Sequence, residues 1–576
     1  MEKKTIKKND IYTIEIEDLS TDGSGIGKVD GYTLFVKDAL IGDTAEVKVI
    51  KTKKHYGYGR LMRIITPSPD RVEAPCPHAR SCGGCQIQHL SYERQLAFKE
   101  NKVRNLLSRV GHVEDYVMHP IIGMEHPYYY RNKAQFPVGL GKDGQIVTGF
   151  YAGHTHVIVD SAHCCIQAPV NEQLLVIVKK WMTDHDIAPY DETTHKGLVR
   201  HILTRVGFKT KEIMVCLIIN GKRLPHSESL VEALREIPGM TSISFNINQE
   251  KTNVILGSKV VTLWGQDYIT DYIGDVRYQI SPLSFYQVNP VQTEKLYGAA
   301  LKFANPGPND VIWDLYCGIG TISLFMAKKA KQVYGVEIVP QAIDDAKRNA
   351  AINDIHNAEF YVGKAEEVLP QTYEREHIHA DIIVVDPPRK GCDESLLACI
   401  TQMQPKRVVY VSCDPATLAR DLKYLEERDY KVKEVQCVDM FGHSVHVETV
   451  VLLSQHRDKN TCLDERGSRQ IEMQASRLAS LLAQKPDDTI EIDLDLDELD
   501  ATSAELKATY QEIKDYVLKE FGLKVSSLYI SQVKRKCGIE VGENYNLPKS
   551  ENARVPQCPK EKEDAIKAAL KYFAML

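Results

Sequence analysis

The chain has no apolar run that approaches the roughly 20 residues a membrane-spanning helix needs. Its first residues, MEKKTIKKND, contain no hydrophobic signal region. The 14 cysteines are too dilute over 576 residues for a disulfide scaffold, so we expect thiols, metal ligands or nucleophiles in a reducing cytoplasm. There is no excess of positive charge either, since the formal net charge is -6, so nucleic-acid binding would have to come from local patches. What remains is an ordinary soluble composition and a length that predicts several domains.

Residues 1–66 alternate like short strands, at 12–16, 33–36, 44–50 and 59–65, with glycine turns between them. This spacing predicts a small β-barrel. Its later part interleaves cations with tyrosines, which suits phosphate contacts and base stacking: Lys48, Lys51, Lys53, Lys54, His55, Tyr56, Tyr58, Arg60 and Arg63. A merely solvated barrel face is the alternative, because acidic residues nearly balance the basic ones in this segment.

A cysteine-rich segment, CPHARSCGGC, follows and contains Cys76, Cys82 and Cys85. Three thiolates this close would repel one another unless a metal or cluster neutralised them. The fourth ligand would be Cys164 or Cys165, and we favour Cys164 because Cys165 occupies a position where an apolar residue would pack. The spacing lacks the two close doublets usual for zinc and favours an iron–sulfur cluster, with free thiols as the alternative.

The rest of the segment 67–277 predicts an amphipathic helix at 92–112 and an inserted α+β region at 198–261. Between them, YYYRNK carries Arg131 and Lys133 beside a tyrosine cluster. Arginine next to aromatic rings can hold an RNA backbone and stack bases, although a strand with a charged end explains the pattern equally well.

Residues 278–455 predict a doubly wound α/β domain of seven strands with an antiparallel edge. VIWDLYCGIGT gives a strand, a turn with Gly318 and Gly320, and a helix, and the next strand ends in Glu337, placed to accept hydrogen bonds from a ribose. The spacing differs from a dinucleotide fingerprint and favours S-adenosylmethionine. The fourth strand, in DIIVVDPPRKG, places Asp386 at its carboxyl end.

The stretch VSCDP places Cys413 after the fifth strand and before a helix, at the sheet edge where ligands bind. A thiol exposed near a helix N-terminus is expected to have a lowered pKa and to be nucleophilic. Addition of this sulfur to C6 of uracil would activate C5 for methylation, and a base must then remove the C5 proton. We assign Glu448, at the start of the last strand, as that base, with His443 and His446 as rivals.

The motifs SFYQVN, DLYCGIGT, GVEI, DPPRKG, SCDP and HVETV, in this order, resemble the RNA uracil-5 methyltransferase family. The barrel resembles a TRAM domain, and with the cysteine set it resembles the 23S rRNA branch. The resemblance implies that Gln287, Tyr316, Glu337 and Asp386 contact S-adenosylmethionine, that Cys413 is the nucleophile and that Glu448 accepts the proton. It also implies a [4Fe-4S] cluster on Cys76, Cys82, Cys85 and Cys164. Lys364 departs from the acid or amide often found near the adenine.

The segment 456–576 lies outside the resemblance. It predicts helices at 470–483, 503–521 and 526–536, around an acidic run at 486–500, with a helix-turn-helix-like RNA contact as one possibility. The whole chain is therefore expected to be a monomeric cytoplasmic enzyme that methylates uridine C5 in 23S rRNA. The alternatives are the same chemistry on tRNA and a non-catalytic RNA-binding assembly factor.

Overall fold

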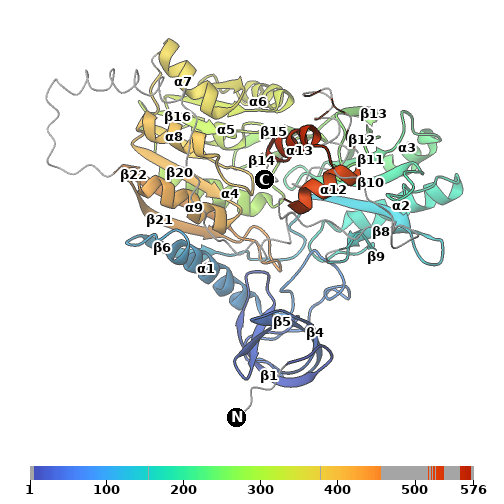
Figure 1. Ribbon diagram of the computed structural model, residues 1–576. Coiled ribbons are helices and arrows are strands. Elements are labelled where there is room, and N and C mark those ends of the chain that lie inside the picture. The colour runs from blue at the N-terminus through green and yellow to red at the C-terminus, as the bar shows by residue number, and fades with distance from the viewer. Residues whose placement is uncertain are drawn as a thin grey trace. The chain divides into compact units, whose positions relative to one another are not determined.

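The computed structural model describes residues 6–153, 155–376 and 378–455, together with 517, 521, 523, 525, 527–536 and 558–572 (Figure 1). The chain divides into two compact units, Met1–Cys462 and Leu463–Leu576. Among the described residues, no helix is both long and apolar enough to cross a membrane.

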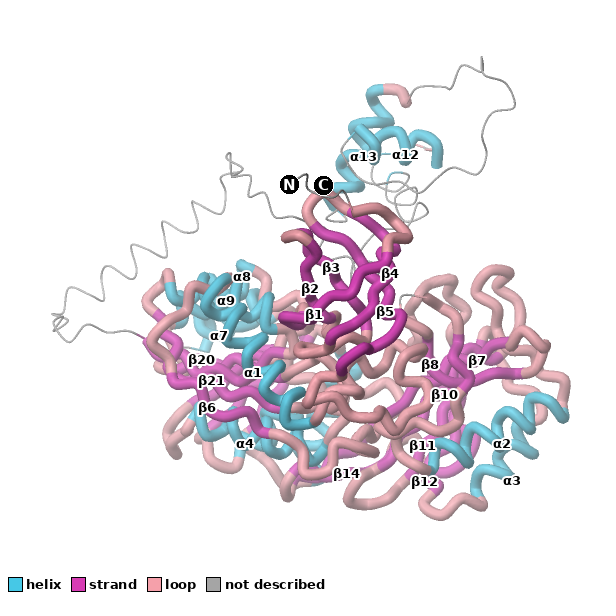
Figure 2. Tube along the Cα trace, turned by 90° about the horizontal axis from the view of Figure 1, so that it is seen from below, coloured by secondary structure: helices cyan, strands magenta, loops and turns pink. Residues whose placement is uncertain are grey.

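The N-terminal segment forms a closed barrel of five strands in the order β1-β2-β3-β5-β4, as the alternating pattern predicts (Figure 2). Its interior is filled by inward-facing aliphatic residues such as Ile16, Leu34 and Val47. At Gly59 a Cβ atom would lie 2.2 Å from the Val47 side chain, so only glycine lets these strands approach. The sequence pattern did not reveal β2. The strands are β1 (Ile11–Leu19), β2 (Gly25–Val29), β3 (Tyr32–Lys37), β4 (Thr44–Thr52) and β5 (Tyr56–Thr66).

The next segment forms helix α1 (Tyr92–Arg109), whose buried stripe consists of Gln95, Lys99, Val103 and Leu107. The sequence predicted a helix on these residues but an apolar face of Leu96, Val103, Leu106 and Leu107. Two polar residues lie in the stripe instead, because they bind the loop between β21 (Tyr430–Val438) and β22 (Glu448–Gln455). Lys99 Nζ lies 2.6 Å from Asp439 Oδ1, and both side chains are completely buried.

A seven-stranded sheet follows, in the order β13-β12-β11-β10-β7-β8-β9. One face packs on α2 and α3 through residues such as Leu174, Leu230 and Phe136. The other face, with Leu203 and Met214, joins the core of the catalytic domain. The elements are β7 (Lys133–Leu140), β8 (Ile146–Tyr151), β9 (Ile158–Asp160), α2 (Val170–Asp184), β10 (Val199–Val206), β11 (Ile213–Ile219), α3 (Ser227–Arg235), β12 (Met240–Ile247) and β13 (Lys259–Gly265).

The catalytic sheet has eight strands in the order β18-β17-β16-β19-β20-β22-β21-β6. The seven predicted strands are present, and β6 (Val117–Ile122) adds an eighth that pairs in parallel with β21. The seven-strand prediction was therefore one strand short. The other strands are β16 (Val311–Leu315), β17 (Gln332–Glu337), β18 (Ala358–Val362), β19 (Ile382–Val385), β20 (Arg407–Ser412), β21 (Tyr430–Val438) and β22 (Glu448–Gln455).

Helices cover both faces of this sheet, which confirms the doubly wound fold (Figure 2). A hairpin, β14 (Ile269–Ile273) and β15 (Val276–Ile280), leads into the domain. The core on one face includes residues of α4, α5 and α6, and the core on the other face includes residues of α1, α7, α8 and α9. The helices are α4 (Pro290–Ala304), α5 (Thr321–Ala327), α6 (Pro340–Ile352), α7 (Ala365–Glu376), α8 (Glu394–Met403) and α9 (Pro415–Glu426).

In the C-terminal unit, the described residues include α12 (Ser527–Lys536) and α13 (Lys560–Tyr572), which share a small apolar core with Val517 and Val525. Helix α12 agrees with the helix predicted at 526–536. The predicted helix 470–483 and the acidic run 486–500 lie outside the described residues, as does most of 503–521.

Candidate active site

Four chemically important residues lie at one edge of four adjacent strands. Strands β16, β19 and β20 are parallel, so Asp314, Asp386 and Cys413 lie at or just beyond their carboxyl ends. Strand β22 is antiparallel to β20, with Ser412 opposite Thr449, so its first residue, Glu448, lies at the same edge. In open α/β sheets ligands bind outside this edge.

The alternation of side chains also places these four residues on one face of the sheet. Asp314 pairs with Val384, and Asp386, Cys413 and Glu448 are each two residues from Val384, Val411 and Val450 respectively. Those three valines belong to the core that includes α4. The acids and the thiol therefore face α4. On that helix, the charges of Asp314, Asp386 and Glu448 contribute to the raised pKa of the buried Tyr297.

Cys413 is fixed by the turn that joins β20 to α9. Asp414 is the N-cap and accepts hydrogen bonds from the backbone N–H groups of Ala416 and Thr417, and Pro415 begins the helix. Asp414 N donates to Ser412 Oγ at 3.1 Å. The Cys413 side chain is half-buried and lies at the site rather than within the packed core.

The expectation of a lowered pKa at Cys413 was wrong. Burial, which has the largest effect, and the neighbouring carboxyl groups of Glu448 and Asp386 together raise the pKa of the thiol to about 12. The guanidinium of Arg389 acts in the opposite direction. The sequence pattern did not reveal these causes, because the burial of the sulfur and the two carboxyl groups come from other strands of the sheet.

The carboxyl groups of the site also bind protons more tightly than usual. Burial raises the pKa of Glu448, with a further contribution from Asp386, and burial and Asp314 raise that of Asp386. The pKa of Asp314 is raised to about 7 by burial, although Ser323 Oγ donates to its Oδ2 at 2.5 Å. Glu448 Oε2 and Asp314 Oδ1 are buried and have no hydrogen-bond partner. Buried polar atoms without partners are costly, so both oxygens are candidates for contact with a ligand.

Asp314 was not assigned a role from the sequence. The available signal was an acid inside the otherwise apolar strand VIWDL.

The glycine-rich turn after β16 contains several residues with positive φ, a conformation that lets the backbone approach a ligand closely. Gly318 and Gly320 have φ values of 54° and 82°, and Tyr316 has the unusual value of 107° for a residue with a side chain. Nothing lies within 4 Å of the position that a Cβ of Gly318 would occupy, so space is open there. Glu337 ends the neighbouring strand β17 and accepts a hydrogen bond from Val339 N at 3.0 Å.

Gln287 lies in the buried segment before α4, and its backbone oxygen accepts a hydrogen bond from Asn132 Nδ2 at 2.9 Å. The N-cap of α4, Asn289, donates through Nδ2 to Met440 O at 3.1 Å. The segment is thus tied to both the central sheet and the loop before β22. Lys364 Nζ lies 3.6 Å from Glu367 Oε1 on the surface.

The two rival bases lie in the loop between β21 and β22. His443 stacks on Tyr128 with ring centroids 4.4 Å apart, and its backbone N–H donates to Gln95 Oε1. Burial lowers the pKa of His443 and of His446 to about 4, so both imidazoles are neutral and weakly basic at pH 7.

The cysteine set comes together in space. Burial raises the pKa of Cys85, with further contributions from Cys164, Cys82 and Cys76. Cys165 is buried and interacts with Cys76. Within the described part of the chain, no three His, Cys, Asp or Glu side chains are close enough to hold a single metal ion.

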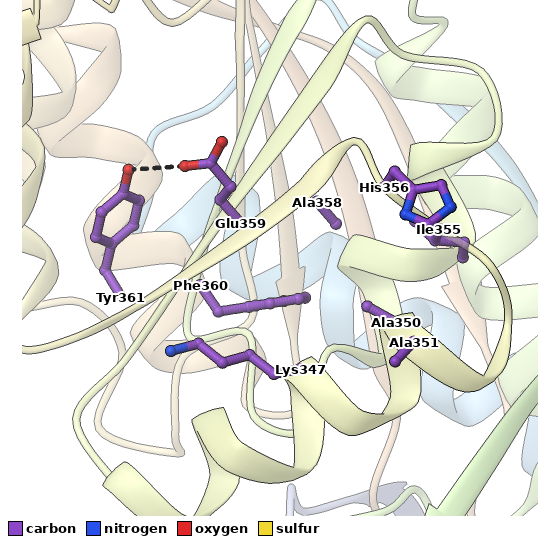
Figure 3. Close-up of a pocket in the computed structure, with 9 residues that line it drawn as sticks. All are labelled: Lys347, Ala350, Ala351, Ile355, His356, Ala358, Glu359, Phe360 and Tyr361. Atoms are coloured by element: carbon purple, nitrogen blue, oxygen red, sulfur yellow. Dashed lines mark hydrogen bonds between the residues drawn. The ribbon is translucent and has the colours of Figure 1, made fainter.

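A separate cavity of about 520 Å³ lies between α6 and β18 (Figure 3). Lys347 extends from α6, and on β18 Tyr361 donates to Glu359 at 3.3 Å. None of the residues predicted for the site lines this cavity.

Comparison with known proteins identifies the family. Residues 91–456 match the model of the tRNA (uracil-5-)-methyltransferase family, and residues 7–62 match the TRAM domain. An uncharacterized RNA methyltransferase of Halalkalibacterium halodurans is 52% identical over 449 residues, covering 78% of this chain and 98% of that protein. One from Clostridium tetani is 49% identical over 455 residues, covering 79% and 98%.

Among solved structures, the tRNA (uracil-54, C5)-methyltransferase of Pyrococcus abyssi in complex with S-adenosyl-L-homocysteine matches with a TM-score of 0.61. It is 28% identical and covers 77% of this chain and 99% of its own. The chain belongs to the RNA uracil-5 methyltransferase family and carries a TRAM domain. This confirms the resemblance found in the motifs.

The electrostatics of this methyltransferase predict how Cys413 reacts with iodoacetamide. We expect slow alkylation of Cys413 at pH 8, because burial and the carboxyl groups favour the thiol over the thiolate. Above pH 9, Glu448→Gln should accelerate alkylation about tenfold, since it removes the carboxylate with the largest effect on the pKa of the thiol, whereas Arg389→Gln should slow it. Mass spectrometry of the peptide containing Cys413 measures the rate. Alkylation that is fast at pH 7 and insensitive to both substitutions would contradict this electrostatic account.

Proposed function

We propose that this protein uses S-adenosylmethionine to form 5-methyluridine in 23S rRNA through a covalent bond between Cys413 and uracil C6. The observation that carries the proposal is the position of Cys413 and Glu448 on adjacent strands, at one edge and on one face of the sheet. A nucleophile and a base in this arrangement can act on neighbouring atoms of one flat ring.

The residues of the chain account for each step. Cys413 Sγ gives an electron pair to C6, and the ring becomes nucleophilic at C5, which takes the methyl group. Glu448 then accepts the C5 proton, and the C6–S bond breaks to return the electron pair to Cys413. Glu448 suits this task better than His443 or His446, because the lowered pKa of each histidine makes it a weak proton acceptor.

The methyl donor fits the turn after β16. Gly318 leaves open space beside the backbone of the turn, and Glu337 and Asp386 lie at or just beyond the carboxyl ends of the two strands that flank β16. Tyr316 belongs to the turn itself, and its side chain packs on the core that includes α7, α8 and α9, so its assignment to the donor comes from the resemblance alone. The bound donor supplies an electrophilic methyl group. Gln287 and Asp386 are assigned to hold it toward the uracil, and Arg389 is exposed beside them, where it can meet a phosphate.

Two cationic regions support RNA as the substrate. Phe35, Tyr56 and Tyr58 form a ring cluster on the barrel with centroids 5.6–6.0 Å apart, among the lysines and arginines of β4 and β5. In the central sheet, Lys133 lies opposite Arg205, and burial together with the charges of Arg205 and Arg131 lowers the pKa of Lys133 to about 7. Arg205 is buried and donates to Ser284 O, so only the half-buried Arg131 and Lys133 of this group could meet a phosphate.

The cysteine set supports a [4Fe-4S] cluster on Cys76, Cys82, Cys85 and Cys164. The thiols are near enough to raise one another's pKa. Four cysteine thiolates are the usual ligands of such a cluster, and the spacing of Cys76, Cys82 and Cys85 lacks the two close doublets usual for zinc. Cys164 interacts with three members of the set, whereas Cys165 interacts with Cys76 alone, which favours Cys164 as the fourth ligand. The cluster would neutralise the thiolates and fix the loop.

The substrate can be tested directly. The purified full-length protein should transfer tritium from labelled S-adenosylmethionine to protein-free 23S rRNA, with the product mapping as 5-methyluridine. The cysteine set and the barrel favour rRNA, whereas the tRNA activity in the name of the Pyrococcus abyssi structure favours tRNA as the second candidate. Transfer to tRNA alone would support that candidate, and no transfer to either RNA would support a non-catalytic role.

The proposed roles of Cys413 and Glu448 predict different failures on substitution. Cys413→Ala should abolish turnover and form no adduct. Glu448→Gln should lower turnover by about 10² to 10⁴, because the C5 proton is no longer removed, and a covalent RNA–protein adduct should accumulate on denaturing gels. His446→Gln is the matched control and should not accumulate adduct. An adduct in His446→Gln but not in Glu448→Gln would assign the base to the histidine.

The proposed cluster predicts a brown protein after anaerobic purification, with broad visible absorbance and about four iron atoms per chain. Cys164→Ser should lose most of the iron, whereas Cys165→Ser, the neighbouring thiol, should retain it. Stoichiometric zinc without iron would contradict the proposal, and the reverse result for the two variants would move the fourth ligand to Cys165.

A further inference from the structure

The three acids of the active site form a row along the sheet. Asp314 on β16, Asp386 after β19 and Glu448 on β22 share one edge and one face, and Cys413 lies between the last two. We call Asp314, Asp386 and Glu448 the carboxyl row. Neighbouring members of the row also interact electrostatically. Asp314 raises the pKa of Asp386, and Asp386 raises the pKa of Glu448.

The surroundings of the carboxyl row contain little compensating charge. Tyr297 from α4 faces all three acids, and its hydroxyl is hydrogen-bonded to Thr321 at 2.9 Å. Glu337 adds a further negative charge near Asp314, and Asp414 adds one near Cys413. Arg389, which is exposed, is the cation that acts on Glu448. Asp439, in the loop before Glu448, is paired with the buried Lys99.

Asp314 and Glu448 are buried and Asp386 is half-buried, and with so little compensating charge a row of this kind favours the protonated over the fully ionised state. Yet the proposed mechanism needs Glu448 as a carboxylate at the moment when the C5 proton must leave. A positive charge bound beside the row would resolve this conflict, since it favours the ionised acids.

The methyl donor brings such a charge and then loses it. S-adenosylmethionine is a sulfonium cation, and its product S-adenosylhomocysteine is a neutral thioether. The glycine turn assigned to this ligand directly follows the strand that carries Asp314. One unit of charge therefore disappears next to the row during every methyl transfer.

We propose that the carboxyl row holds one exchangeable proton, which the cationic methyl donor expels and which Glu448 takes up again from C5 once the donor has become neutral. The inference rests on the proposed function. In this inference Asp314 is a positioning residue. The donor's positive charge favours ionised Asp314, and the electrostatic interactions of Asp314 with Asp386 and of Asp386 with Glu448 extend the effect to the proposed base.

The protons and electrons balance over one cycle. Donor binding sends the proton of the row to solvent. Cys413 loses its thiol proton to solvent before attack, and elimination returns the thiolate, which regains a proton, so this exchange has no net effect. The C5–H electron pair stays with the ring as the proton passes to Glu448, and the C6–S pair returns to sulfur. The reaction's proton therefore remains on the row until the next donor binds.

Calorimetry with the full-length protein tests the inference without RNA. Titrations at pH 7.5 in buffers of different ionisation enthalpy count the protons exchanged on ligand binding. We expect S-adenosylmethionine to release about one proton per chain and S-adenosylhomocysteine about none. Between pH 6 and 7 the affinity for S-adenosylmethionine should rise up to about tenfold, because it prefers the ionised row, while the affinity for the neutral product stays nearly constant.

Substitutions identify the groups involved. Glu448→Gln and Asp314→Asn should each reduce the difference in proton release between the two ligands. Glu359→Gln, on the exposed edge strand β18, is the control and should leave it unchanged. If Asp314→Asn fails to fold, the difference in proton release measured for Glu448→Gln alone tests the inference.

The outcomes separate the two hypotheses. Equal proton release with both ligands in the unmodified protein would overturn the inference and leave the proposed function standing. Binding of neither ligand would overturn the proposed function and the inference together.

Discussion

The antiparallel pairing of β22 with β20 is the constraint on which the active site depends. The parallel strands β16, β19 and β20 deliver their terminal residues to one edge. Only a strand of opposite direction can bring its first residue to that edge, and β22 does so with Glu448. The register is equally important, because a slip of one residue would turn Glu448 to the other face, away from Cys413. The apolar residues Val450 and Leu452 pack on the α4 side and fix this register.

The loop that leads into β22 is held by residues from outside the catalytic domain. Asp439 accepts hydrogen bonds from Lys99 Nζ at 2.6 Å and from Tyr92 OH at 2.7 Å. Lys99 also donates to Phe441 O. A buried ion pair contributes little net stability after desolvation, but it is costly to break, so it fixes one conformation of the loop. Helix α1 thereby positions the strand that carries the proposed base.

The barrel is linked to the same loop. Lys102 Nζ on α1 donates to Thr21 O of the barrel at 3.0 Å and to Val445 O at 3.3 Å. Val445 packs with Ile87 and Leu90 of the segment that contains the first three cysteines. The residues before Glu448 are thus linked to the barrel through Lys102 and pack on the segment that carries the first cysteines. A site built this way requires the N-terminal half for support.

Local patterns predicted the elements well where the residues of one short motif determine the structure of that motif. The sequence SCDP specifies a strand end, a capping aspartate and an N1 proline, and the structure has each of them. Patterns failed where the cause lies far away in the chain. Lys99 looks like a solvent-facing residue of α1 until Asp439, 340 residues later, is known. Strand β6 has no parallel partner nearby in sequence, and the carboxyl groups that raise the pKa of Cys413 come from two other strands.

The high pKa of Cys413 is consistent with a nucleophile that is needed only when both substrates are bound. A permanent thiolate near the surface would be open to alkylation and oxidation, since thiolates rather than thiols react. In this site burial, with a contribution from the carboxyl groups when they are ionised, favours the protonated sulfur, and the guanidinium of Arg389 acts in the opposite direction. A cation bound at the adjoining turn would shift the same balance toward the thiolate and toward ionised acids. The negative charge that makes the free site unreactive would then also favour binding of a cationic methyl donor over its neutral product, and so turn one electrostatic feature into both protection and turnover.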